Sequence, residues 1–269
     1  MSAPLSWRAE LGRQVRRRRT VWSGVLLLAL PLILVGAFAI GGGDPSPGSF
    51  VDLATSGAAN FSVFTLAVSS TFLLLVLAAL LVGDAVPAEA SWSSLRYLLV
   101  APVPRARLLT SKLVVGLASV VVVVVVVVGW SLLVGGVFYG WSSFVGLTGA
   151  ELGWGEFAPR LLAVTAYVVV TLLPVGAIAF CLGVRTDAPL AAVGGAVMVT
   201  IVAAILGQID NLGSLRSALP LYYSGAWFDL LAPDPDTTDL VHGVAWSLLY
   251  TVVFVGLAYE LFRRKDVLS

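Results

Sequence analysis

The chain has few charged residues for its length, and this shortage excludes most soluble folds. Of its 269 residues, 12% are charged and 59% are hydrophobic. Ordinary globular domains carry roughly 25% charged residues. A soluble core cannot hide so many apolar side chains, so we expect much of the surface to face lipid.

Residues that commonly carry catalytic or metal chemistry are also scarce. The single cysteine, Cys181, excludes an intramolecular disulfide and any multi-thiolate metal site. The single histidine, His242, cannot pair with another to ligate haem or a metal within one chain. Neither lysine, Lys112 or Lys265, follows a glycine, so a phosphate-binding P-loop is absent. We therefore expect no enzyme activity and no cofactor in the chain itself. Its net charge of +1 is no indication of nucleic-acid binding.

Long apolar runs dominate what remains. Each run has about the 20 residues that cross ~30 Å of hydrocarbon as a helix. Charged residues are absent from each run before its final turn, as expected because charge at mid-bilayer is unfavourable. The sequence thus predicts an all-α, polytopic membrane protein, a single transmembrane domain over residues 1–269. Its six transmembrane helices are expected at residues 22–40, 61–82, 113–139, 161–182, 189–206 and 241–262.

The first apolar run has an alternative interpretation as a cleaved signal peptide. Arg16 to Arg19 would form its basic flank and Ala37 to Ala39 its cleavage site. Because the apolar part of a signal peptide usually has only ~7 to 15 residues, an uncleaved span fits better.

The distribution of basic residues predicts the orientation. All but two of the 16 lysines and arginines lie at the termini or in the loops at 83–112 and 183–188; the exceptions are Arg160 and Arg216. Basic residues accumulate on the cytoplasmic side of membrane proteins. We therefore expect a multi-pass protein of the cytoplasmic (inner) membrane with both termini in the cytoplasm, and with the loops at 41–60, 140–160 and 207–240 outside.

The segment before the first span has the pattern of an amphipathic helix. Trp7, Leu11 and Val15 recur every four residues among arginines. This pattern is typical of a helix that lies in the membrane surface, and we expect it over residues 1–20. Alternatively, the arginines only set the topology.

The loop at 83–112 is much longer than a connection requires. It reads as two short helices around a corner, in which Ser93 or Ser94 caps the first helix and Pro102 ends it. Such an element between two spans can transmit force from a soluble partner.

This loop resembles the signature of the ABC type 2 (ABC-2) exporter permeases. In that family an acidic residue, a Gly-Thr-Leu step, a leucine-rich helix, a Pro-Val-x-Arg corner and a lysine follow in order. The chain departs from the family at Ser93 and Ser94, where Gly and Thr are usual, so the start of the helix is less defined. It matches at Glu89, Leu95, Leu98, Leu99, Pro102, Val103, Arg105 and Lys112.

The resemblance implies partners as well as a fold. Two ABC ATPase subunits, which would hold ATP and magnesium, are expected to dock on the cytoplasmic loop and the N-terminal helix, and a second permease copy or paralogue to pair with the chain in the bilayer. Short helices between spans five and six are expected to form an external gate. The residues so implicated are Glu89, Leu95, Arg96, Leu98, Leu99, Pro102, Arg105 and Arg107 in the loop, Trp7, Glu10, Leu11 and Arg13 in the N-terminal helix, and Pro220, Tyr222, Tyr223, Trp227 and Phe228 in the gate.

The expected function is therefore that of a permease subunit in an ATP-driven exporter. The polar residues of the spans are neutral, which favours a drug, an antibiotic or a lipid-like substrate, although neutral grooves also pass glycans. They include Ser69, Ser70, Thr71, Thr165, Tyr167, Thr200, Tyr250 and Thr251. Serine and threonine hydroxyls also hold helices together, which is the alternative role for these residues. One alternative is a self-contained carrier or channel, although such proteins usually carry ionisable groups in the membrane. Another is an ABC complex that serves membrane biogenesis. Aromatic side chains at 220–228 also suit a plain membrane-interface cluster.

Overall fold

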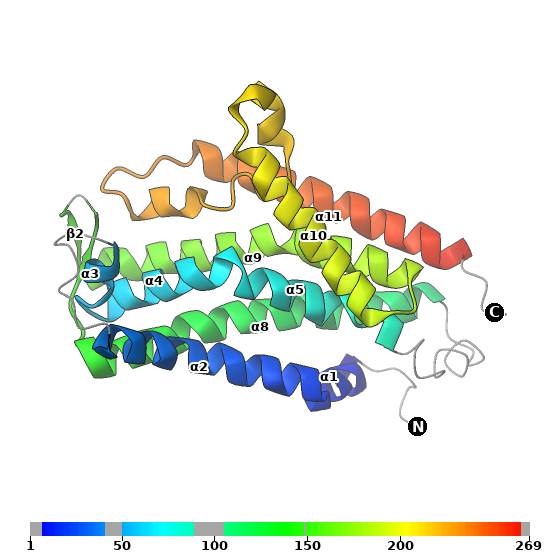
Figure 1. Cartoon of the computed structure of the whole chain (residues 1–269), viewed down its shortest axis with the longest axis horizontal. Coiled ribbons are helices and arrows are strands. Elements are labelled where there is room, and N and C mark those ends of the chain that lie inside the picture. Colours follow the sequence, from blue (N-terminus) through cyan, green and yellow to red (C-terminus); the bar gives the residue numbers. More distant parts are fainter. Residues whose placement is uncertain (1–6, 41–49, 89–104, 148, 265–269) are drawn as a thin grey trace.

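The computed structural model describes residues 7–40, 50–88, 105–147 and 149–264. Its long helices lie side by side along one axis, and α10 crosses them obliquely (Figure 1). The N- and C-terminal ends lie at the same end of this bundle. The helices are α1 (Trp7–Arg16), α2 (Arg18–Ile40), α3 (Phe50–Ala54), α4 (Ala58–Thr71), α5 (Leu73–Gly83), α8 (Arg105–Tyr139), α9 (Trp154–Arg185), α10 (Pro189–Gly207) and α11 (Thr238–Arg264).

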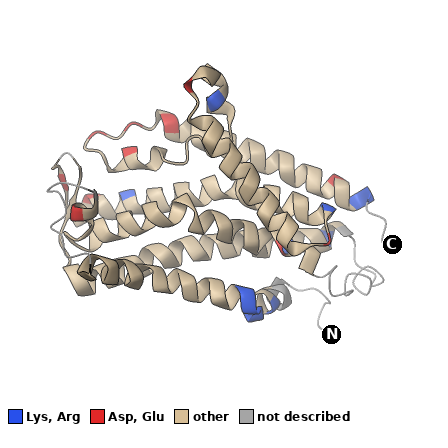
Figure 2. Ribbon diagram, in the orientation of Figure 1, with Lys and Arg blue, Asp and Glu red and all other residues tan. Residues whose placement is uncertain are grey.

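Five of the described helices, α2, α8, α9, α10 and α11, are each long and apolar enough to cross a membrane. Helices α4 and α5 together make up to a sixth span, with a bend of 57° between them. The prediction of an all-α, polytopic membrane protein is confirmed, and the helices are compatible with six spans. Charged residues gather at the ends of the bundle and in the connecting segments (Figure 2).

Helix α9 is the centre of the bundle. In its most apolar stretch 67% of the residues are buried, against 11% in α2 and 17% in α11. It packs against α5, α8, α10 and α11. The outer helices therefore present apolar side chains to lipid or to another protein, as expected for a membrane domain.

Close contact between α5 and α9 depends on two glycines. A Cβ atom on Gly183 would lie 2.5 Å from the backbone oxygen of Gly83, and a Cβ on Gly83 would lie 2.8 Å from the Cβ of Ala179. Small residues allow membrane helices to approach closely, and van der Waals packing then stabilises the pair.

The second span is broken, although the sequence predicts a continuous helix over residues 61–82. Helix α4 ends at Thr71, and Phe72 has non-helical backbone angles. No proline or glycine lies at this point. The hydroxyls of Ser69, Ser70 and Thr71 donate to carbonyls one turn earlier, at 3.1, 3.0 and 3.0 Å. Such bonds compete with the backbone pattern and bend helices.

The connections contain one element that the sequence analysis did not predict, a ribbon, and short helices that it did predict. Strands β1 (Phe144–Val145) and β2 (Glu151–Leu152) form a short antiparallel ribbon. Between α10 and α11 lie the 3₁₀ helices η1 (Asp210–Ala218) and η2 (Ala226–Leu231), where the sequence predicts short external helices. Helix α8 begins at Arg105, so the last part of the expected 83–112 loop is helical.

Replacement of Gly183 by alanine should destabilise the bundle, because the added methyl group meets the backbone of Gly83. Overpacking of this kind costs about 1–3 kcal/mol. A lower melting temperature of the purified protein in detergent is expected. Gly194→Ala, on α10 with no atom within 4 Å of the added Cβ, is the matched control and should melt like the parent protein.

Candidate functional site

The end of the bundle that carries both termini is the expected ATPase-facing end (Figure 1). Most of the loop residues implicated there lie outside the described part of the chain: Glu89, Leu95, Arg96, Leu98, Leu99 and Pro102. Arg105 opens α8, and Arg107 is exposed in its first turn. Their contact with an ATPase stays a prediction.

The N-terminal helix is present as α1, and the backbones of Trp7 and Glu10 belong to it. Leu11 is 40% exposed and Val15 is 57% exposed. Arg13 is also exposed. Exposed apolar and basic side chains on one short helix suit a position at the membrane surface.

An ion cluster with a buried carboxylate joins this region to the second span. Asp84 follows α5, and its side chain is 8% exposed. Its carboxylate accepts hydrogen bonds from Arg19 at 3.1 Å and from Arg17 at 3.4 Å. Nearby, the side-chain amide of Gln14 donates to the Leu81 carbonyl at 3.1 Å. Burial raises the pKa of the Asp84 carboxyl, whereas the charges of Arg19 and Arg17 act to lower it.

The same end holds a further polar contact between spans. The hydroxyl of Thr110 in α8 lies 2.6 Å from that of Tyr259 on α11. Two residues later in α8, Lys112 is 1% exposed, although it is the last residue of the expected loop at 83–112. These residues tie α8 into the bundle at its basic end.

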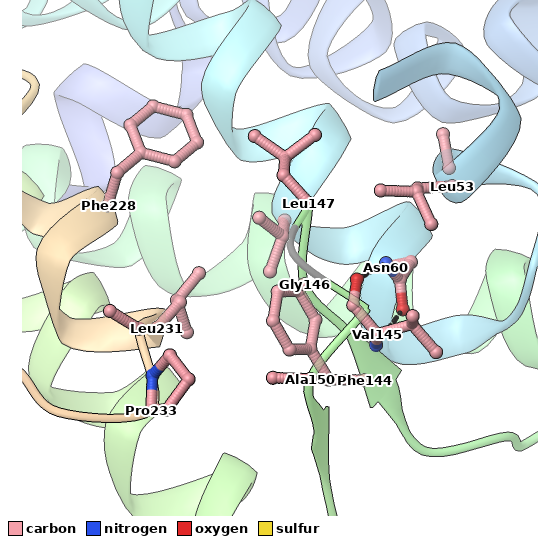
Figure 3. A pocket seen from close by; sticks show the side chains of 13 residues that line it. Leu53, Asn60, Phe144, Val145, Gly146, Leu147, Ala150, Phe228, Leu231 and Pro233 are labelled. Atoms are coloured by element: carbon pink, nitrogen blue, oxygen red, sulfur yellow. Dashed lines mark hydrogen bonds between the residues drawn. The ribbon is translucent and has the colours of Figure 1, made fainter. Parts of the chain in front are cut away.

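A cavity of about 180 Å³ lies at the opposite end of the bundle, between α3, α4, the ribbon and η2 (Figure 3). Asn60 of α4 is its main polar side chain. Its amide nitrogen donates to the Val145 carbonyl at 2.7 Å, and its amide oxygen accepts from the Val145 backbone nitrogen at 2.9 Å. These two bonds hold the ribbon against α4. With both amide groups engaged, the lining presents mainly apolar surface.

A larger cavity, of about 470 Å³, lies beside the break in the second span. It is lined by α4, α5, α9, α10 and the segment that leads into η2, and no charged residue belongs to its lining. A pocket within a helix bundle, away from charge, is a default position for a ligand.

The hydroxyl groups of this central cavity are largely occupied. Ser70 and Thr71 donate to Ala67, Thr171 donates to Val168 at 3.0 Å, and Thr200 donates to Val197 at 2.8 Å. These hydroxyls can still accept hydrogen bonds through their lone pairs. The cavity therefore suits an uncharged molecule that is mostly apolar.

The predicted gate residues follow the end of α10. Trp227 is 1% exposed and stacks on Phe228 with ring centroids 3.8 Å apart. Phe228 lines both cavities, whereas Trp227 lines the central one. The Tyr222 and Tyr223 rings meet edge to face at 4.9 Å. The structure thus brings two of the four aromatic residues, Trp227 and Phe228, to the cavities.

Two neighbours secure this aromatic segment, and residue types alone do not reveal them. The Tyr167 hydroxyl of α9 donates to the Tyr223 carbonyl at 2.7 Å. The Arg160 guanidinium donates to the Leu230 carbonyl at 3.3 Å and also to that of Ala232. Arg160 stands out in the sequence as a basic residue on the otherwise poorly basic side, but its partners are distant in the chain.

Backbone strain accompanies the same segment. Leu221 has a positive φ of 65°, a conformation that is unfavourable for a residue with a side chain. Its side chain lines the central cavity. Strained residues tend to occur at functional sites, where the surrounding structure holds them in place.

Apolar helices thus line an uncharged cavity in the bundle, and basic residues gather at one end. Residues 13–208 match the family described as ABC-2 family transporter protein. The match covers well over half of the chain, so the chain belongs to the ABC-2 transporter family. A comparison with individually curated proteins finds no match.

Family membership establishes a coarse identity. The chain is the multi-pass membrane component of an ABC transporter, and membership implies partnership with ABC ATPase subunits. The matched range includes α2 to α10, whereas the aromatic segment at 219–231 lies beyond it.

Loss of the Tyr167 hydroxyl should loosen the aromatic segment. Tyr167→Phe leaves the Tyr223 carbonyl without this donor, and a hydrogen bond of this kind contributes about 0.5–1.5 kcal/mol. Faster hydrogen exchange is expected over residues 219–231, by roughly three- to tenfold, since such free energies change an opening equilibrium by that factor. In Tyr139→Phe, whose ring packs on Phe61, exchange over 219–231 should not change.

Proposed function

We propose that the chain is the permease subunit of an ATP-driven exporter that moves an apolar or amphipathic molecule outward across the cytoplasmic membrane. The observation that carries the proposal is a charge-free cavity of 470 Å³ within a bundle of the ABC-2 family. Such a cavity holds a ligand, but it offers no group that binds a driving ion or proton.

The energy source in this proposal is a pair of separate ATPase subunits. They bind ATP and magnesium themselves, because the sequence lacks a P-loop. Their docking surface is the cytoplasmic loop from Glu89 to Arg107 together with α1. When ATP closes the ATPase dimer, this surface moves, and the transporter exchanges an inward-open for an outward-open state.

Orientation follows from charge. Arg16, Arg18 and Arg19 precede or open α2 and are exposed at the end that carries both termini, and Arg263 and Arg264 lie at the same end. Basic residues favour the cytoplasmic side. Both termini are therefore cytoplasmic in this proposal, and the ribbon and the small cavity lie outside.

A second permease copy, or a paralogue, completes the transporter. Helices α2 and α10 have little buried surface in a single chain. On α10, Met198, Val202 and Ile205 are 61%, 46% and 61% exposed. Part of this apolar surface packs against the partner permease and the rest faces lipid.

The substrate class follows from the cavity. A charged group there would lose its hydration without gaining a counter-ion, which is strongly unfavourable. An uncharged drug, an antibiotic or a lipid-like molecule fits the apolar walls and the accepting hydroxyls. Trp227 and Phe228, with Pro220, Tyr222 and Tyr223, form the external gate, since Phe228 borders both cavities.

Co-expression with an ATPase encoded beside this gene tests the proposal. A copurifying complex is expected, with ATP-dependent transport of a lipophilic fluorescent dye in liposomes. Transport by the chain alone would instead identify a self-contained carrier or channel. A complex that hydrolyses ATP but affects only the assembly of the membrane would favour a role in biogenesis.

Charge reversal at Arg107 should weaken ATPase binding. This side chain is exposed in the first turn of α8, beside the proposed docking loop. Arg107→Glu is expected to reduce the copurified ATPase several-fold, with stronger loss at high salt, because rim charges mainly set association rates. Arg216→Glu, on η1, is the control and should leave ATPase recovery unchanged.

Filling the central cavity should inhibit transport without loss of the complex. Ala204 of α10 lines the cavity, so Ala204→Phe places an aromatic ring in it. Dye transport should fall at least tenfold while the ATPase still copurifies. Ala191→Phe is the control, because Ala191 is exposed on the same helix away from the cavity. Equal transport by the two variants would place the substrate elsewhere.

A further inference from the structure

The ion cluster of Asp84, Arg17 and Arg19 connects two parts of the chain that the proposed ATPase contacts separately. Arg17 lies between α1 and α2, and Arg19 lies in the first turn of α2. Asp84 is the residue after α5, at the end of the second span, and it precedes the docking loop in the sequence. The ion pairs thus join the N-terminal helix to the root of that loop.

The environment of Asp84 distinguishes this cluster from an ordinary surface ion pair. The Asp84 side chain is 8% exposed, and its partners Arg17 and Arg19 are 27% and 60% exposed. In the pair on η1 it is the carboxylate, Asp210, that is 90% exposed. Exposed pairs contribute little, because water screens them. A buried carboxylate that loses its cations is left uncompensated, which is strongly unfavourable. Separation of α1 from the second span is therefore opposed.

A second contact acts between the same two elements. The Gln14 side chain of α1 is buried, and its amide donates to the Leu81 carbonyl in the last turn of α5. Leu81 lies about one helical turn before Asp84, and Gln14 lies about one turn before Arg17. Two polar attachments at neighbouring turns restrain both rotation and separation of α1 relative to the end of α5.

We propose that Asp84 is a positioning residue that fastens α1 to the second span, so that movement of the docking loop by the ATPase moves α1 and the start of α2 as one body. The proposal rests on the proposed function for the source of the movement. It adds that the two ATPase contacts, the docking loop and α1, move together. The movement reaches the first span through Arg17 and Arg19.

The first experiment measures the attachment itself, without an ATPase. Because Cys181 is the only cysteine in the sequence, Cys181→Ala provides a background for labelling. A nitroxide on Val15→Cys, an exposed position of α1, reports the mobility of this helix by electron paramagnetic resonance. Asp84→Asn should raise the mobility of the label, and Asp210→Asn, which breaks an exposed pair, should not.

Exchange of the charges separates attachment from a general loss of stability. Asp84→Arg combined with Arg17→Asp and Arg19→Asp restores the cluster with reversed polarity, and it should return the label toward the parent mobility. Asp84→Glu keeps the negative charge, so its label should be about as immobile as in the parent protein. This variant replaces Asp84→Asn in the comparison if Asp84→Asn does not fold. Equal mobility in the parent protein and in Asp84→Asn would overturn the proposal.

The second experiment measures coupling in the complex with the ATPase. Nitroxides on Val15→Cys and Thr237→Cys, both exposed, report the distance between α1 and the opposite end of the bundle. ATP, magnesium and vanadate should change this distance in the parent complex. In Asp84→Asn the change should be lost, although the ATPase still copurifies and hydrolyses ATP.

Two results would contradict the coupling. One is an unchanged ATP-dependent shift in Asp84→Asn; the other is loss of the ATPase from that variant, which would make Asp84 part of the docking surface. Failure of the parent chain to bind any ATPase would instead contradict the proposed function, and the mobility measurement would still decide the attachment.

Discussion

In hydrocarbon every backbone N–H and C=O group must find a partner within the protein, and the rest of this structure depends on that constraint. It makes the long apolar segments helical, even where a run of valines would favour a strand in water. Side-chain donors accompany two departures from regular α-helix. At the break of the second span, Ser69, Ser70 and Thr71 supply hydroxyl donors to nearby carbonyls. Beyond α10, Tyr167 and Arg160 donate to the carbonyls of the irregular segment.

Both departures border the central cavity, and this association has a physical cause. Continuous helices would pack closely through small residues, as α5 and α9 do at Gly83 and Gly183. A bend of 57° separates neighbouring side chains and leaves a space. No charged residue lines this space. The feature that disturbs the helix therefore also produces the cavity.

Charge follows a complementary rule. A charged side chain near the membrane is tolerated at an interface or beside a partner. Asp84 forms ion pairs with Arg17 and Arg19, and Arg160 donates hydrogen bonds to backbone carbonyl groups. The cluster at Asp84 lies where α1, the second span and the docking loop meet.

The general architecture could be predicted from the sequence because it depends on local properties. Hydrophobic length and the scarcity of charge predict the membrane helices, and the loop pattern from Glu89 to Lys112 predicts the ABC-2 family, which the comparison confirms. The aromatic residues Trp227 and Phe228 were predicted as a group, and they do lie together. The orientation and the docking residues stay predictions.

The sequence by itself determined that this is a helical membrane permease component, since apolar length and loop motifs are read along the chain. Only the tertiary structure decided where the second span breaks, which hydroxyls face the cavity, and which residues secure the irregular segments. Asn60 pairs with Val145, Tyr167 with Tyr223, and Asp84 with Arg19. These partners are far apart in the sequence, and no local pattern encodes the packing of helices that brings them into contact.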